Sequence, residues 1–294
     1  MRLISYQVEG GSRLGVVAEG RAVAAVDLLP GGPQTMDELL RGGGDALARL
    51  RTAADSAEIQ ARGRPVDELR LLAPVPRPGK VVAIGRNYPA HAAEEDAPPP
   101  SSPLIFAKWS SCVIGHGDEI RWDPALTSQV DYEAELGLVI GRKTRRVDEA
   151  HALDAVLGYT CINDVSARDL QFGDGQWTRG KSLDTFCPIG PDLVTADEIP
   201  NPDDLALSCT VNGEQLQSAR TSEMFFGVAR IISHCSQAFT LEPGDVIATG
   251  TPAGVGAFRK PPRFLKDGDT VTVSVEHIGD LVNVCRFEQP GRGA

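Results

Sequence analysis

The feature that most constrains the fold is an alternating run, DYEAELGLVIG, at residues 131–141. Apolar residues recur at every second position from Ala134 to Ile140, which is the period of a β-strand with one apolar face. The opposite face carries Glu133 and Glu135, whose Cα atoms would lie about 7 Å apart. Neighbouring carboxylates repel each other. The sequence therefore predicts a strand whose acidic face is either solvated or part of a cation site.

A third carboxylate follows the next predicted strand. That strand covers residues 156–162, and Asp164 comes almost directly after it. Ser166 could begin a short helical turn, on which a spacing of three residues would place Arg168 and Gln171 on one side. Because the candidate ligands are carboxylates, with no histidine or thiolate among them, an oxygen-only site suits Mg²⁺ or Mn²⁺ better than Zn²⁺.

At these residues the chain resembles the fumarylacetoacetate hydrolase family. The resemblance implies a metal-dependent enzyme that acts on short 2-oxo or 1,3-dioxo acids. It also implies a β-rich α+β fold with a mixed β-sheet roll as catalytic domain, and usually a homodimer. The matching motifs occur in the family's order: residues 86–94 (RNYPAHAAE), 131–135 (DYEAE), 163–169 (NDVSARD), 180–182 (GKS) and 250–254 (GTPAG).

The resemblance also assigns roles to single residues. Glu133, Glu135 and Asp164 match the family's metal ligands. Lys181 matches its active-site lysine, whose ammonium group would offset the excess negative charge of three carboxylates on one divalent ion. Residues 175–182 also fit a phosphate-binding P-loop pattern. No strand is predicted before that segment and no long helix after it, so we do not expect a nucleotide site.

His91 is the candidate general base. Glu94 follows it at i+3, a spacing at which a carboxylate can orient an imidazole on a helical turn, and Glu95 is a second candidate partner. Glycines in the loop 249–256 allow backbone amides to converge on an anionic oxygen. The predicted substrate contacts are Arg86, Tyr88, Arg168, Gln171, Gly250 and Thr251.

The chain is expected to divide at a proline-rich segment. Residues 2–29 alternate like a small antiparallel meander, and helical patterns follow from Thr35. Residues 71–79 carry proline at nearly every second position, which neither a helix nor a central strand accommodates. We therefore predict a small N-terminal α+β domain at 1–76 and a catalytic domain at 77–294.

Composition narrows the class of protein. The net charge of −11 and the lack of a basic stripe argue against nucleic-acid binding. The N-terminus lacks the pattern of a signal peptide, and no apolar run has membrane-spanning length, so we predict a cytoplasmic protein without membrane contact. The six cysteines are scattered and mostly have apolar neighbours, which favours reduced core thiols.

The sequence thus predicts a divalent-metal-dependent hydrolase that cleaves a C–C bond in a short 2,4-dioxo acid, such as an acylpyruvate. The reaction would pass through an enolate stabilised by the metal, with a water activated by His91 and Glu94. The same groups would serve an isomerase or tautomerase of hydroxymuconate-like diacids, or a decarboxylase of oxaloacetate-like β-oxo acids. A non-catalytic metal-binding scaffold is a further alternative. The absence of a G-x-S-x-G motif argues against a serine nucleophile.

Overall fold

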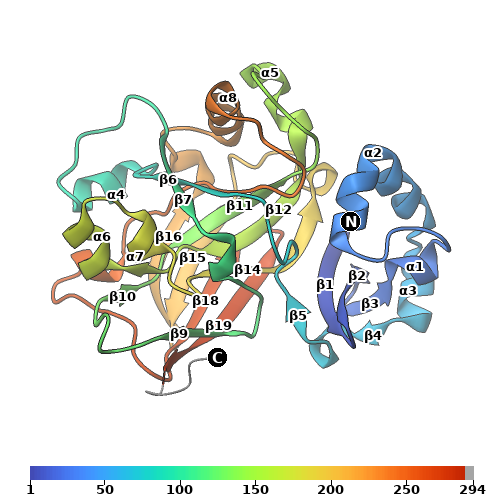
Figure 1. Ribbon diagram of the computed structural model, residues 1–294, viewed down its shortest axis with the longest axis horizontal. Helices are drawn as coiled ribbons and strands as arrows, with labels where there is room; N and C mark the ends of the chain where they lie inside the picture. Colours follow the sequence, from blue (N-terminus) through green and yellow to red (C-terminus); the bar gives the residue numbers. More distant parts are fainter. Residues whose placement is uncertain (289–294) are drawn as a thin grey trace.

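The computed structural model describes residues 1–288, which form a β-rich α+β fold with three sheets (Figure 1). The strands of the largest sheet are β1 (Arg2–Val8), β2 (Gly11–Ala18), β3 (Arg21–Ala24), β4 (Arg64–Pro65), β5 (Leu71–Leu72), β6 (Val81–Gly85), β7 (Leu104–Lys108), β8 (Val113–Ile114), β11 (Ala134–Ile140), β12 (Val156–Asn163), β14 (Cys187–Thr195) and β17 (Val246–Ala248). Its main path runs β4-β3-β2-β1-β14-β12-β11-β17-β6-β7, while β5 pairs with β1 and β8 with β14.

The second sheet has the order β16-β15-β18-β19-β9, and β10 pairs with β13 in a third. Parallel pairs, such as β17 with β6 and β19 with β9, lie among antiparallel ones, so both large sheets are mixed, as expected. The bounds are β9 (Glu119–Trp122), β10 (Val130–Asp131), β13 (Ser166–Ala167), β15 (Ala206–Val211), β16 (Glu214–Arg220), β18 (Thr270–Val275) and β19 (Gly279–Phe287).

Helices are short and lie around the sheets (Figure 1). The longest, α2, begins after Thr35, whose hydroxyl accepts a hydrogen bond from the Glu38 amide and so caps the helix. The helices are α1 (Ala25–Leu28), α2 (Met36–Ala53), α3 (Ser56–Arg62), α4 (Pro89–Glu94), α5 (Glu149–Ala152), α6 (Arg168–Asp174), α7 (Thr178–Lys181) and α8 (Val228–Ala238).

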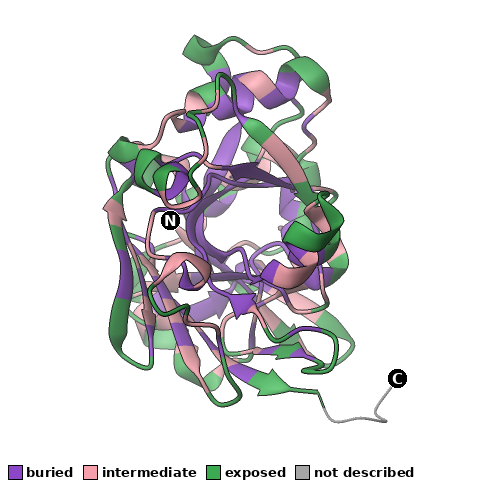
Figure 2. Cartoon of the chain, turned by 90° about the vertical axis from the view of Figure 1, so that its left-hand side faces the viewer, coloured by how far each residue is buried: buried purple, intermediate pink, exposed green. Residues whose placement is uncertain are grey.

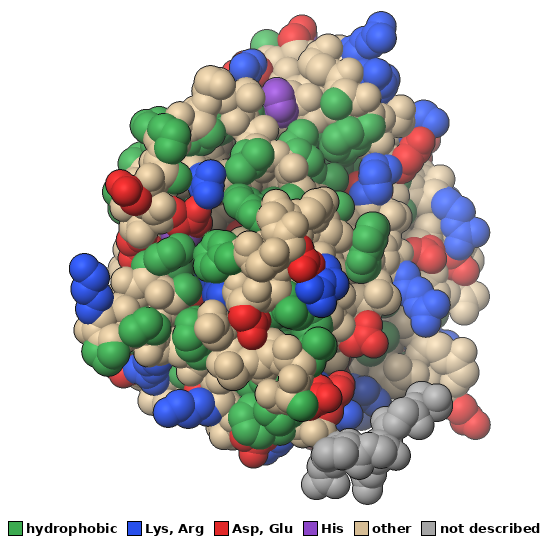
Figure 3. Space-filling model, turned by 60° about the vertical axis from the view of Figure 1, so that its left-hand side comes forward, with side chains coloured by type: hydrophobic (Ala, Val, Ile, Leu, Met, Phe, Trp, Pro, Cys, Tyr) green, Lys and Arg blue, Asp and Glu red, His purple; other side chains and the backbone are tan. Residues whose placement is uncertain are grey.

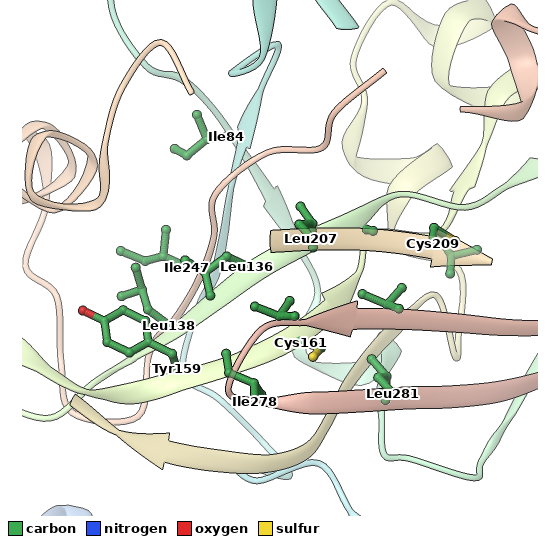
Figure 4. Close-up of a cluster of buried hydrophobic side chains, with 14 of the residues drawn as sticks. Ile84, Leu136, Leu138, Tyr159, Cys161, Leu207, Cys209, Ile247, Ile278 and Leu281 are labelled. Carbon is green, nitrogen blue, oxygen red and sulfur yellow. The ribbon is translucent and has the colours of Figure 1, made fainter. Parts of the chain in front are cut away.

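β11 is buried on both faces, because it lies between β12 and β17 and has a packed layer on either side. On one face, Leu136 and Leu138 pack in the core that includes Leu207 of β15 and Leu281 of β19 (Figure 4). On the other face, Val139 belongs to a core shared with α2. Buried residues accordingly follow the inner strands in Figure 2, while exposed residues lie on the outer helices and loops.

The N-terminal meander continues the largest sheet. β1 pairs with β14 through Arg2 opposite Val194 and Leu3 opposite Leu193. The division near residue 76 stays a prediction, and residues 289–294 of the predicted catalytic domain lie outside the described part of the chain. Within that described part, no helix is both long and apolar enough to cross a membrane.

Candidate active site

Three carboxylates meet where β11 begins and β12 ends. The two strands are antiparallel, with Ala134 opposite Asn163, so the residues flanking that pair are neighbours. The Asp164 amide donates to the Glu133 carbonyl over 2.9 Å, which fixes this junction. Oxygen atoms of Glu133, Glu135 and Asp164 all lie within 4.8 Å of one another. The structure therefore brings together the three residues that the sequence singled out as metal ligands.

The acidic face of β11 is not solvated, so the solvated face that the sequence left open is wrong. The exposed fractions of Glu133, Glu135 and Asp164 are 4%, 1% and 0%. The physical reason is that β11 is a central strand with a layer on each face, which a period of two cannot reveal. Three buried oxygen donors of like charge suit a hard divalent cation such as Mg²⁺ or Mn²⁺.

Two lysines neutralise part of this charge. Lys181 at the end of α7 places its ammonium nitrogen 2.6 Å from Glu133 Oε2 and 2.8 Å from Asp164 Oδ2. Lys108 at the end of β7 lies 2.6 Å from Asp164 Oδ1 and also donates to the Lys181 carbonyl. Sequence reasoning missed Lys108, although a lysine that ends an otherwise apolar strand is a signal that could have found it.

Glu135 differs from its two neighbours because it forms no ion pair within residues 1–288. Burial raises the pKa of Glu135 well above its usual range, and repulsion from Asp164 and Glu133 raises it further. Its Oε2 accepts one hydrogen bond, 2.7 Å long, from the Gly250 amide. Burial would also raise the pKa of Glu133, but the cations of Lys181 and Arg168 outweigh burial and lower that pKa to about 2.

Arg168 is held by protein carboxylates. Its Nε donates to Asp131 Oδ2 over 2.9 Å and its Nη1 to Gln171 Oε1 over 2.9 Å. Its Nη2 lies 2.7 Å from Glu133 Oε1 but has no partner in hydrogen-bonding geometry within residues 1–288, so this contact is electrostatic. Arg168 and Gln171 thus lie on one side of α6, as predicted. Asp131, which sequence reasoning did not single out, anchors Arg168 and also accepts the Gly256 amide at 2.7 Å.

Around the triad, four buried carboxylates face three buried cations, so the cluster has one carboxylate more than it has cations. If Glu135 keeps its proton, the carboxylates and cations balance, whereas a bound divalent cation would displace that proton and leave one positive charge. The carboxylates are Asp131, Glu133, Glu135 and Asp164, and the cations are Lys108, Arg168 and Lys181.

Ser166 does not begin the helix: it lies in β13, its hydroxyl donates to the Asp164 carbonyl over 2.8 Å, and α6 starts at Arg168 without a side-chain cap. Because β13 pairs with β10, the backbone at Ser166 is extended, and the helix begins only at Arg168. The P-loop pattern at 175–182 contains the four-residue helix α7, and the next element is strand β14, so the helix that would bind phosphate does not follow it.

His91 on α4 lies between two carboxylates. Its Nδ1 is 3.4 Å from Glu94 Oε2 and its Nε2 is 3.1 Å from Glu95 Oε1, so both candidate partners contact the ring. Arg86 Nε fixes Glu95 at 2.6 Å. Burial lowers the pKa of His91, but hydrogen bonds to Glu94 and Glu95 outweigh it and raise the pKa to about 9. His91 is therefore an imidazolium at neutral pH.

The other predicted contacts fall into two groups. Tyr88 is buried and its hydroxyl has no hydrogen-bond partner in residues 1–288, which leaves that group available to a ligand. Thr251 already donates to the Ala134 carbonyl over 3.0 Å and accepts from Gln217 over 2.8 Å, while the Gly250 amide holds Glu135. The loop amide thus binds a carboxyl oxygen of the protein itself.

We predict that Lys108→Met destabilises the metal-free protein by about 3 kcal/mol, because it leaves the buried Asp164 carboxylate without that partner. Added Mg²⁺ should restore part of this loss, since a cation at the triad would again neutralise Asp164. Urea unfolding with chelator and with Mg²⁺ measures both effects. Lys80→Met is the control, because Lys80 pairs with Asp245, outside the triad. Equal Mg²⁺ recovery in both variants would contradict the assignment.

The fold and the site together define a catalytic domain of mixed sheets, with a carboxylate triad enclosed beside a histidine–carboxylate group. Residues 80–286 match the family model described as fumarylacetoacetate (FAA) hydrolase C-terminal. The chain belongs to the fumarylacetoacetate hydrolase family, whose members are enzymes.

Known relatives cover nearly the whole chain. The bovine (Bos taurus) protein named "Oxaloacetate tautomerase FAHD2A, mitochondrial" is 43% identical over 290 residues, which are 96% of this chain and 91% of that protein. Fumarylacetoacetate hydrolase from Exiguobacterium antarcticum has a TM-score of 0.84 and 39% identity, covering 98% of this chain and 100% of that one. Maleylpyruvate hydrolase from Sphingobium sp. SYK-6, solved with manganese(II) and pyruvate, has a TM-score of 0.81 and 31% identity, again over 98% and 100%.

Proposed function

We propose that this protein is a metal-dependent tautomerase that interconverts the enol and keto forms of a short 2-oxo diacid resembling oxaloacetate. The observation that carries this proposal is His91, whose position between Glu94 and Glu95 keeps it protonated at neutral pH beside the carboxylate triad. An imidazolium can give a proton to carbon but cannot accept one from water. The relative named an oxaloacetate tautomerase supports the same reaction.

Glu133, Glu135 and Asp164 would hold Mg²⁺ or Mn²⁺, and the donor set and its negative charge support this assignment. The relative solved with manganese(II) supports Mn²⁺. When bound, such an ion withdraws electron density from the 2-oxo oxygen and so favours the enolate over the free carbonyl.

The chain's own residues would move the protons. In the enol-to-keto direction, His91 would give its proton to C3, the enol oxygen would release its own proton to solvent, and His91 would then recover a proton from solvent. Glu95, anchored by Arg86, keeps the ring in place throughout. Lys181 would donate a hydrogen bond to the oxygen that carries negative charge, because its ammonium group lies at the triad.

Hydrolysis of an acylpyruvate-like C–C bond is the second candidate, and similarity to maleylpyruvate hydrolase favours it. It would need neutral His91 to take a proton from water. With a pKa of about 9, about one molecule in a hundred holds neutral His91 at pH 7. A cation at the triad would lower that pKa and enlarge this fraction. Decarboxylation of an oxaloacetate-like acid would not need His91 to take a proton from water. It would therefore depend on the metal site but not on His91.

The test is the decay of enol oxaloacetate, followed by ultraviolet absorbance, with Mg²⁺ or Mn²⁺ and with excess chelator. We expect metal-dependent acceleration of ketonisation and slower or absent cleavage of acylpyruvate. Parallel assays of acylpyruvate cleavage and carbon dioxide release separate the three reactions. If the metal-loaded protein cleaves acylpyruvate but leaves enol decay at its spontaneous rate, the tautomerase proposal is wrong and the hydrolase takes its place.

A homodimer and a cytoplasmic location stay predictions. Support for self-association comes from exposed apolar side chains, since Trp109 is 57%, Phe172 50% and Leu126 49% exposed. Hydrophobic side chains also gather on the face turned forward in Figure 3. The molar mass in solution would decide the first prediction. For the second, the relative cited above is named as mitochondrial, so imaging of the full-length protein in cells is required.

A further inference from the structure

A charged cavity lies beside Glu94, the carboxylate that contacts His91 Nδ1. The chain between β17 and β18 passes through the short 3₁₀ turn Gly256–Phe258 and then carries the cations Arg259, Lys260, Arg263 and Lys266. These residues line a cavity of about 770 Å³, together with Glu94 and Gly254. We call this cavity the basic pocket.

The basic pocket adjoins the candidate active site through Glu94. One oxygen of Glu94 accepts the Gly254 amide at 2.8 Å, and the other faces His91 Nδ1 at 3.4 Å. Phe258, directly before Arg259, places its ring centroid 6.3 Å from that of His91 and 6.3 Å from that of Phe172 on α6. A ligand that occupied the basic pocket would therefore lie next to the proton-transferring group.

Most of the cations in the basic pocket have no carboxylate partner. Arg263 pairs with Glu214, but Arg259, Lys260 and Lys266 form no ion pair within residues 1–288. Arg259 makes only a long contact, 3.4 Å, to the Leu216 carbonyl. In a chain of net charge −11, three unpaired cations around one cavity form a local field that attracts anions.

The acids in the basic pocket offset only part of this field, because four cations and two carboxylates, Glu94 and Asp269, line the cavity. Asp269 uses one oxygen for the Asn212 side chain at 2.8 Å and the other for the Lys266 amide at 2.9 Å. Glu94 is engaged with Gly254 and His91. Both carboxylates thus have hydrogen-bond partners of their own, and within residues 1–288 neither forms an ion pair with Arg259, Lys260 or Lys266.

The charge balance at the triad explains why a second anion site is needed. With a divalent cation bound, the buried cluster holds one positive charge, which one substrate carboxylate neutralises. A second carboxylate placed there would be buried without a counter-charge, which is strongly unfavourable. A diacid therefore needs cations outside the cluster, and the basic pocket supplies them beside His91.

We propose that Arg259, Lys260 and Lys266 bind the distal carboxylate of a 2-oxo diacid and so make the enzyme select diacids over monoacids of equal length. This inference rests on the proposed function, because it assumes that the 2-oxo end of the acid binds at the triad. Arg263 keeps its pairing with Glu214 and takes no part in the selection. Solvent partly screens these side chains, so the selectivity decreases as the salt concentration rises.

The test compares 2-oxoglutarate with 2-oxopentanoate, which have the same chain length and differ in the distal carboxylate. Isothermal titration calorimetry on the Mg²⁺-loaded protein gives both dissociation constants. The diacid is expected to bind on the order of tenfold more tightly, the size expected for a few partly exposed charged contacts. In the triple variant Arg259→Gln, Lys260→Gln, Lys266→Gln this preference should fall to about one, while 2-oxopentanoate changes less than about twofold.

A second triple variant controls for net charge. Arg49→Gln, Arg77→Gln and Lys143→Gln remove the same number of exposed cations away from the basic pocket, and this variant should keep the preference. Equal binding of both acids by the parent protein, or an unchanged preference in the pocket variant, would overturn the inference. Loss of Mg²⁺-dependent binding for both acids would instead refute the proposed function, and with it this role of the pocket. The monoacid therefore distinguishes the two failures.

Discussion

Glu135→Gln should abolish metal-dependent activity while leaving the metal-free protein at least as stable as the parent. Glu135 forms no ion pair within the described residues, and its buried carboxyl group is held near Glu133 and Asp164. A neutral amide removes that repulsion at almost no change in volume. The loss of a proposed metal ligand should reduce activity by on the order of 10²-fold or more, since even outer-shell partners of ligands change activity by about 10- to 100-fold.

Glu133→Gln is the matched variant with the opposite effect on stability. It also removes a proposed ligand, but it leaves the buried cations of Lys181 and Arg168 without one of their partners. We expect destabilisation of the metal-free protein by about 3 kcal/mol. Urea unfolding in chelator measures both variants, and Mg²⁺ titration measures their metal affinity. Equal destabilisation by the two substitutions would contradict the charge distribution described for the triad.

The pH dependence of stability should separate the two carboxyl groups as well. The folded pKa of Glu135 is raised, so the folded state holds a proton that the unfolded chain releases, and metal-free stability falls as pH rises above the usual range of a glutamate. The folded pKa of Glu133, about 2, is lowered, so its contribution to stability is present above the usual glutamate range and lost toward acid. Mg²⁺ affinity should rise with pH, because Mg²⁺ must displace the proton of Glu135.

His91→Asn should slow the reaction by about 10²- to 10⁴-fold, the usual span for a positioned acid–base group. Mg²⁺ affinity should change little, because His91 is not a proposed ligand. Steady-state kinetics on the enol of oxaloacetate and on an acylpyruvate measure the first effect, and calorimetry measures the second. Wild-type ketonisation by this variant would exclude His91 as the proton donor.

The protonation state of His91 can be measured directly in the metal-free protein. Nuclear magnetic resonance of the imidazole should give a pKa near 9, well above that of an exposed histidine. Glu95→Gln should lower this pKa at least as much as Glu94→Gln, because Glu95 lies closer to the ring and is fixed by Arg86. The contact distances thus give His91 both of the partners that the sequence left open. A pKa near 6.5 would remove the main support for the tautomerase.

The sequence by itself determined the proposed ligand set. A period of two puts Glu133 and Glu135 on one face of a strand whatever surrounds it, and Asp164 follows the next strand closely enough to meet them in an antiparallel pair. Spacing on a single helical turn likewise placed both Glu94 and Glu95 within reach of His91. The spacings within one strand and within one helical turn are local, so they follow from chain geometry alone, whereas Asp164 also needs the pairing of β11 with β12.

The tertiary structure alone decided how those groups are charged. Lys108 reaches Asp164 across 56 positions of sequence and Asp131 anchors Arg168 across 37, contacts that no local period encodes. It also placed β14 in the largest sheet despite Pro188 and Pro191, because an irregular register against β12 tolerates residues that break a regular ladder. Burial, and therefore the proton on Glu135, depends on the layers packed around β11, which only the folded chain brings together.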